Sequence, residues 1–138
     1  MSNKPKVMLG QRPTHVTLMV DVTLPDGRAA VIEMRYRYRT RSEYGALVDA
    51  HMAKARAEQA ALKAQLKPGE IPPYSELQHQ LGVRDTQAQH ICDIADGWNL
   101  DRAFDLEAVR ELCDELPGAA QAIIDRYQLA LIEGRRGN

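Results

Sequence analysis

Cysteines, aromatic residues and long apolar runs are scarce in this sequence. The two cysteines, Cys92 and Cys113, lie far apart and form no CxxC pair, so neither a disulfide framework nor a cysteine-rich zinc site is indicated. No apolar run approaches the roughly 20 residues that a bilayer-spanning helix needs. The apolar residues 7–9, which follow Lys4 and Lys6, are too few for a secretory signal. These absences predict a reduced protein of the cytoplasm with no membrane partner.

The short motifs of common catalytic sites are also missing. The sequence has no GxxxxGK[ST] or GxGxxG loop to hold a phosphate, no HExxH pair and no GxSxG nucleophile turn. We therefore expect no catalytic residues, no cofactor and no resident metal. The residues available for catalysis are therefore few, although many enzymes also lack short motifs.

What the sequence does have is a small aliphatic core and an uneven charge. Its 138 residues suit one compact domain, and its 18 alanines favour helices. Residues 1–41 carry eight Lys or Arg and three acids, a net charge of +5, whereas residues 42–138 carry ten and sixteen, a net charge of −6. This division favours docking within the chain or a charged partner, and it lacks the broad positive excess of a general nucleic-acid binder.

Two alternating segments predict an antiparallel β-hairpin over residues 14–39. Between them, Pro25-Asp26-Gly27 has the composition of a tight turn. The apolar face of the hairpin must pack on helices or on a third strand, for which residues 7–9 are the candidate. Residues 1–13 are predicted to be a flexible N-terminal arm. The alternation predicts the core face of the hairpin to comprise Val16, Leu18, Val20, Val22, Leu24, Ile32, Met34, Tyr36 and Tyr38.

Caps and breakers predict helices in the rest of the chain. Thr40 and Glu43 have the capping-box spacing, so a long helix is expected over residues 41–66, followed by a proline-rich connector over 67–74. The helical part, 75–138, is expected to begin with a short helix from Ser75 to Leu81 that is ended by Gly82. The next helix is expected to be capped by Asp85 or Thr86 and closed by Asp96-Gly97-Trp98. A helix capped by Asp105 and a last helix from Pro117 to Gly134 are expected to follow.

The fold class that follows is α+β. Residues 14–138 are expected to form a single domain, in which the hairpin precedes about five helices.

An arginine row on the second predicted strand is the sharpest charged feature. In a strand, Arg35, Arg37 and Arg39 project from one face about 6–7 Å apart, which is comparable to the spacing of phosphates. This row is a candidate contact for an acidic protein or, as an alternative, for a nucleic acid. The intervening tyrosines are expected on the core face, where they cannot stack on bases. A protein contact is therefore favoured over nucleic acid.

Two further clusters of residues are candidate sites. His90, Cys92, Asp93 and Asp96, with His79 upstream, match no standard zinc spacing, so a solvated helix face beside a buried thiol is the favoured interpretation. Trp98 and Phe104 are the sole Trp and Phe and lie close in sequence. They predict a small aromatic cluster, with a role as partner contact as the less favoured alternative.

The order of these segments resembles a known family, the tail assembly chaperones of long-tailed bacteriophages and prophages. The Arg/Tyr-rich strand runs into Thr40-Arg-Ser-Glu-Tyr44. Asp96-Gly97-Trp98 and Phe104 then resemble the family's DGW…F…ENV segment, with Glu107-Ala108-Val109 in place of ENV. The resemblance covers residues 14–50 and 91–138, and its last part runs from Asp114-Glu-Leu-Pro-Gly-Ala-Ala120 to Glu133-Gly-Arg-Arg-Gly-Asn138.

The resemblance implies a non-enzymatic role in the bacterial cytoplasm. Such a chaperone binds the long helical tape-measure protein, helps recruit the major tail (tube) protein, and leaves before the virion is mature. In many such phages a ribosomal frameshift produces a longer form. Self-association is a further expectation.

A helix-on-helix contact is the binding mode predicted for the Ala-rich residues 53–66. In this mode Leu62 and Leu66 contact the partner. The alternatives are a small nucleic-acid-binding phage regulator that uses the strand over 35–41, a structural component of the tail, and a metal-dependent enzyme around His90 and Asp93.

Overall fold

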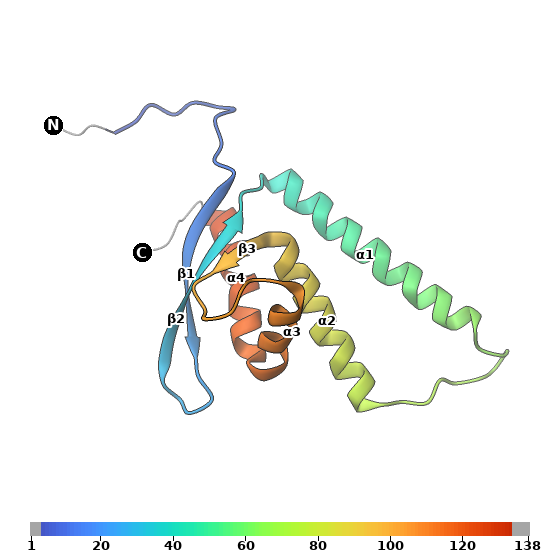
Figure 1. Cartoon of the computed structure of the whole chain (residues 1–138). Coiled ribbons are helices and arrows are strands. Elements are labelled where there is room, and N and C mark those ends of the chain that lie inside the picture. The colour runs from blue at the N-terminus through green and yellow to red at the C-terminus, as the bar shows by residue number, and fades with distance from the viewer. Residues whose placement is uncertain (1–3, 134–138) are drawn as a thin grey trace.

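The computed structural model describes residues 4–133 and has an α+β fold, as predicted. Figure 1 shows helices α2, α3 and α4 on one side of a small sheet, with α1 extending away from it. The predicted end of the last helix at Gly134 lies outside the described residues. In chain order the elements are β1 (His15–Thr23), β2 (Ala29–Arg37), α1 (Arg41–Ala64), α2 (Glu76–Ile94), β3 (Ala95–Trp98), α3 (Leu106–Glu115) and α4 (Pro117–Glu133).

The β1–β2 hairpin forms in the register that the alternation predicts. Leu18 pairs with Met34 and Val20 with Ile32, and all four side chains are buried on the inner face. The turn closes through Gly27, whose φ of 89° is left-handed and favours a residue without Cβ. Tyr38 is an exception to the predicted core face, because β2 ends at Arg37 and Tyr38 is exposed beyond it.

A third strand exists, but it is not the predicted one. Residues 7–9 belong to no strand, and Val7 and Leu9 are almost fully exposed. The third strand is β3, which pairs antiparallel with β2 and completes the order β1-β2-β3. It thus comes from Asp96-Gly97-Trp98, which was predicted to close a helix. Gly97 lies against Arg35, whose Cβ would be 3.4 Å from an added side chain at that position.

The prediction of about five helices is wrong, because the described residues contain four. Two predicted helices are one continuous helix, α2, capped at its start by the Ser75 side chain. Gly82 was expected to end a helix but lies within this one, where glycine costs only about 1 kcal/mol relative to alanine. The buried residues Ala88, Ile91 and Ile94 hold the second half of α2 on the core. Asp85 caps nothing and instead forms an ion pair with Arg84.

The core lies between the inner face of the sheet and helices α2, α3 and α4. Tyr36 is fully buried there, and its hydroxyl donates to the Ile123 carbonyl of α4 at 2.6 Å. Its burial raises the pKa of the phenol well above the usual value. The largest side chains that are fully buried are Tyr36, Leu18, Met34, Ile91, Ile94, Ile123, Val20 and Val109.

The outer edge of β1 accepts a hydrogen bond from a helix. The bonds from Tyr38 to Thr14 and from Leu24 to Arg28 show that even-numbered residues of β1 bond to β2. Odd-numbered residues therefore direct their backbone N–H and C=O outward. At the middle of this edge, Arg126 of α4 donates from Nε to the Met19 carbonyl at 3.2 Å.

Helix α1 begins as predicted and ends two residues early. Thr40 accepts from the Glu43 N–H, and the Glu43 carboxylate accepts from the Thr40 N–H, so the predicted capping box is confirmed. The helix ends at Ala64, and none of its residues is fully buried. In the described part of the chain, no helix combines the length and the apolar character required to cross a membrane.

Candidate functional site

An open cleft lies where α1 meets α2 and α4. It has a volume of about 520 Å³. Its α1 wall has the apolar side chains of Val48, Met52 and Ala55 beside two charged ones, and α2 contributes the polar side chains of Gln87 and Gln89. In Figure 1 the two helices run in opposite directions and separate toward the connector. The cleft is therefore a groove between two helices that touch at one end.

A chain of polar side chains joins α1 to the rest of the protein at the root of this cleft. Gln128 of α4 donates to the Tyr44 hydroxyl at 2.9 Å, and that hydroxyl lies 3.5 Å from His90 Nε2. The Nδ1 atoms of His90 and His51 are 3.1 Å apart. His51 Nε2 in turn lies 2.7 Å from the Asp93 carboxylate. Two residues of α1, Tyr44 and His51, are thus connected to α2 and α4.

The electrostatics of this chain favour neutral His90. Burial lowers the pKa of His90, and the adjacent His51 lowers it further. Asp93 acts in the opposite direction, and Arg39 adds a small lowering. The pKa of His90 is therefore below its usual value of 6.5.

Beyond His51, apolar side chains remain in water. We call residues 52–83, which comprise the rest of α1, the connector and the start of α2, the helical protrusion. Every residue of α1 after His51 is exposed. Of the large apolar residues in the protrusion, those that are exposed are Met52, Leu62, Ile71, Tyr74, Leu77 and Val83.

The two leucines predicted to contact a partner lie on this protrusion. Leu62 is 64% exposed, and Leu66 is half-buried in the first residues after α1. Leu62 is therefore more accessible to a partner than Leu66. Their role as a contact stays a prediction.

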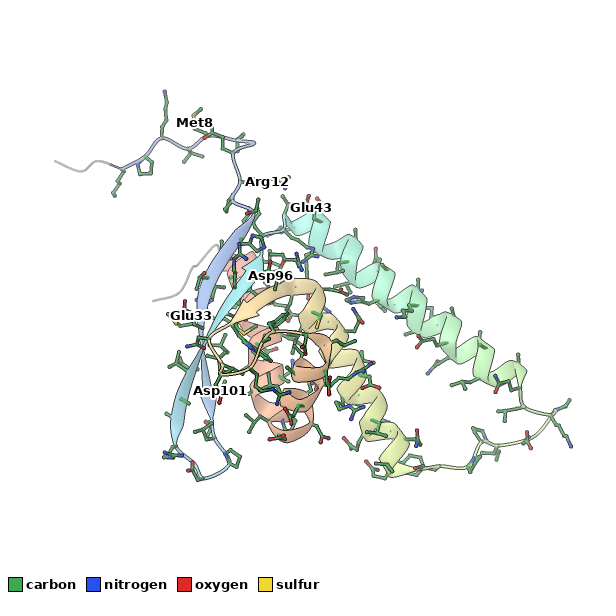
Figure 2. The ribbon with its side chains drawn as sticks, in the orientation of Figure 1. Met8, Arg12, Glu33, Glu43, Asp96 and Asp101 are labelled. Atoms are coloured by element: carbon green, nitrogen blue, oxygen red, sulfur yellow. The ribbon has the colours of Figure 1, made fainter. Side chains whose placement is uncertain are left out.

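The predicted arginine row is divided between two environments. Arg35 and Arg37 lie on the outer face of the sheet, where Asp96 is within 3.4 Å of Arg35 and 3.9 Å of Arg37. His15 is 2.7 Å from the same carboxylate, and Figure 2 labels Asp96 on β3. Arg39 lies beyond the strand, half-buried, and donates to the Tyr127 hydroxyl at 3.4 Å. The three arginines thus form no single row, and one carboxylate partly offsets two of them.

The aromatic pair does come together, as predicted. The rings of Trp98 and Phe104 pack edge to face with centroids 4.9 Å apart, and both are half-buried against the core. Trp98 Nε1 donates to the Arg102 carbonyl at 2.7 Å, which closes the intervening loop. This geometry explains the pair by packing.

The candidate metal ligands lie in different parts of the fold. His90 and Asp93 both belong to the polar chain with His51, but Asp96 is on the outer face of the sheet. Among the described residues, no group of three or more His, Cys, Asp or Glu is placed to hold a metal ion. Burial raises the pKa of both thiols, that of Cys113 to about 11, which makes them weak nucleophiles at neutral pH.

Sequence reasoning missed the polar chain because its members are far apart. His51 and His90 are separated by 39 positions. One signal was present in the sequence. His51 falls between Val48 and Met52 on the apolar stripe of the predicted helix, and a polar residue in such a stripe requires a partner.

Comparison with known protein families identifies the chain. The family model described as phage tail assembly chaperone matches residues 1–138. No curated protein and no solved structure gives a significant match. The chain belongs to the phage tail assembly chaperone family, whose partners are in general phage tail proteins.

Proposed function

We propose that this phage tail assembly chaperone binds the tape-measure protein and helps recruit the major tail (tube) protein, without catalysis. It would act in the bacterial cytoplasm and leave before the virion is complete. A tape-measure chain is long, helical and amphipathic, so it needs its apolar face covered until the tube encloses it. The surface that suits this task is the helical protrusion.

The observation that carries the proposal is the exposed apolar surface of the protrusion. Six large apolar side chains lie in water within 32 consecutive residues, on two helices and the connector between them. Covering one such side chain fully contributes about 1.5–3 kcal/mol. Because most of this gain is realised only in a complex, the protrusion is suited to hold an apolar partner.

The cleft indicates how a helical partner would lie. Met52 and Ala55 line the cleft, and Leu62 continues the same face at helical spacing. A partner helix placed along α1 would bury this stripe and approach α2 from the side. The amides Gln87 and Gln89 of α2 would then face the polar side of the partner helix.

A binding experiment with paired variants tests the proposal. The readout is co-purification of a tape-measure fragment expressed with the chaperone. The double variant Leu62→Asp, Leu66→Asp is expected to lose the fragment, because two carboxylates would have to be desolvated in the contact. Ala53 and Ala60 lie about half a turn away around α1 and are exposed. Ala53→Asp, Ala60→Asp is therefore the matched control and should retain binding.

The outcome is decided by comparison of the two variants. Circular dichroism should give equal helix content for both. Retention of the fragment by the leucine variant would exclude this surface, and equal loss in both variants would show that charge anywhere on α1 is sufficient. The same samples, incubated with the major tail protein, test the recruitment step separately.

A further inference from the structure

We propose that Tyr44, His90, His51 and Asp93 form a proton-sensitive latch that holds the first half of α1 on the protein and releases it in mild acid. The latch itself rests only on the geometry of these side chains. Its use, which is to extend the surface offered to a partner, rests on the function proposed above.

The hydrogen bonds of the latch are consistent with one direction of donation. Tyr44 accepts from Gln128 and can donate its own proton to His90 Nε2. His90 then carries its hydrogen on Nδ1 and donates to His51 Nδ1. His51 donates from Nε2 to Asp93. The tautomers are assigned from this network, and they satisfy every nitrogen of two neutral imidazoles.

An added proton disrupts this arrangement. On His90, it turns Nε2 from an acceptor into a second donor, which faces a hydroxyl that was donating to it. On His51, it places an N–H directly against the Nδ1–H of His90. In either case one of the bonds between α1 and α2 must rearrange, and two charged imidazoles 3.1 Å apart would repel each other.

Little else holds α1 in place. Tyr44, Leu47 and Val48 are the apolar residues of α1 that are partly covered, and none is fully buried. At the start of the helix, Arg12 pairs with Glu43 at 2.9 Å, an exposed contact that Figure 2 shows. Segments with few buried contacts open at small cost in free energy. The latch is therefore a substantial share of what keeps α1 docked.

The charges around His90 set the direction of the pH effect. It faces His51 on α1 and Asp93 on its own helix, and the charge of Arg39 also acts on it. From α4, the ring of Tyr127 packs edge to face against Tyr44, with ring centroids 5.6 Å apart. Burial, together with the smaller effects of His51 and Arg39, outweighs Asp93, so the pKa of His90 is lowered in the docked state. The released state therefore binds the proton more readily, and docking weakens as pH falls below about 6.5.

Release would lengthen the apolar surface. Tyr44, Leu47 and Val48 lie on the same helical face as Met52 and Leu62. In the docked state the first three are only partly exposed. Once released, α1 would present one apolar stripe over its whole length of 24 residues.

Hydrogen exchange measured by mass spectrometry on the intact protein tests the latch. Exchange rates, corrected for intrinsic rates, are measured at pH 7.5 and at pH 5.5. At each pH the rate for peptides from residues 41–51 is divided by the rate for peptides from α3. A single group of this kind raises the released fraction by up to about tenfold over this interval. In the wild type, the exchange rate should rise at pH 5.5 in α1 and not in α3. His90→Gln can form hydrogen bonds without titrating, so it should lower the rise severalfold.

Two further variants keep the result interpretable. His79→Gln changes an exposed histidine outside the latch and should behave as the wild type. Tyr44→Phe removes one hydrogen bond of the latch and leaves both histidines in place, so exchange should increase at both pH values with the pH ratio retained. An unchanged α1 in acid, or the same pH ratio in His90→Gln, would overturn the latch. Because no partner is present, failure of tape-measure binding is a separate result.

Discussion

Helices α1 and α3 begin with equally good caps and yet have opposite relations to the core. Asp105 accepts from the Ala108 N–H at 2.8 Å, and Thr40 with Glu43 forms a full capping box. Nevertheless α3 buries four of its 10 residues, whereas α1 buries none of its 24. A cap therefore indicates where a helix begins and says nothing about what the helix packs on.

The side chains that follow the caps make the difference. The stripe of α3 contains Val109, Leu112 and Cys113, all buried. The stripe of α1 has apolar residues at wider intervals, with His51 among them and alanines on the opposite face. Alanine favours a helix without providing much apolar area. Stability is thus expected to reside in α3 and binding in α1, and each prediction below tests that division.

The largest effect is expected in the core stripe of α3. Leu112→Ala removes a buried side chain and should lower the free energy of unfolding by about 2–5 kcal/mol. Urea unfolding followed by Trp98 fluorescence measures it. A loss below about 0.5 kcal/mol, the range of an ordinary exposed site, would contradict the assignment of α3 to the core.

The two caps should differ in what they stabilise. Asp105→Ala is expected to lower the free energy of unfolding by about 1 kcal/mol, because α3 is coupled to the core. Thr40→Ala removes a cap of similar strength, but the loss should appear mainly as lower helix content of α1. Urea unfolding together with far-UV circular dichroism separates the two effects. Equal losses of global stability would show that α1 is as coupled as α3.

The capping box predicts a local effect of acid on α1. The Thr40 backbone N–H, bonded to the carboxylate, lowers the pKa of Glu43, and Arg12 adds to the effect. The unfolded turn therefore binds the proton first, and the cap weakens as pH falls below the usual 4.5. Amide exchange in the first turn of α1 should rise in this range. Glu43→Gln keeps the capping geometry without a charge. In this variant, amide exchange in the first turn of α1 should not rise in this pH range.

The smallest effect is expected on the protrusion and at the N-terminus. Leu62→Ser should change the free energy of unfolding by less than about 0.5 kcal/mol, because the side chain is already largely in water. Removal of residues 2–11 should also leave it within that range, if residues 14–138 fold as the single domain that we expect. Urea midpoints measure both, and a marked shift would place that segment in the core.

Much of the fold follows from local patterns. Alternation places Leu18, Val20, Ile32 and Met34 on one face, because a half-buried strand requires it. Caps at Thr40 and Asp105 and the proline at the start of α4 locate three helix starts. These features depend only on neighbours in sequence, so the sequence is sufficient to predict them.

The remaining features depend on contacts between distant segments. The four residues of β3 are too few to alternate, and their strand form comes from pairing with β2, about 60 positions earlier. Gly82 has the composition of a helix end, yet burial further along α2 keeps the helix continuous. The candidate site is of the same kind, since Leu62 could be predicted as exposed but the meeting of His51 with His90 could not.

The contact of Arg126 with the outer edge of β1 has a consequence for the resistance of this protein to aggregation. An open strand edge can template fibre growth, because its free N–H and C=O groups accept any extended chain. Here a guanidinium occupies the Met19 carbonyl at the centre of that edge. An extended chain that paired with this edge would have to displace the charged group, so the Arg126 contact protects the protein from edge-to-edge aggregation.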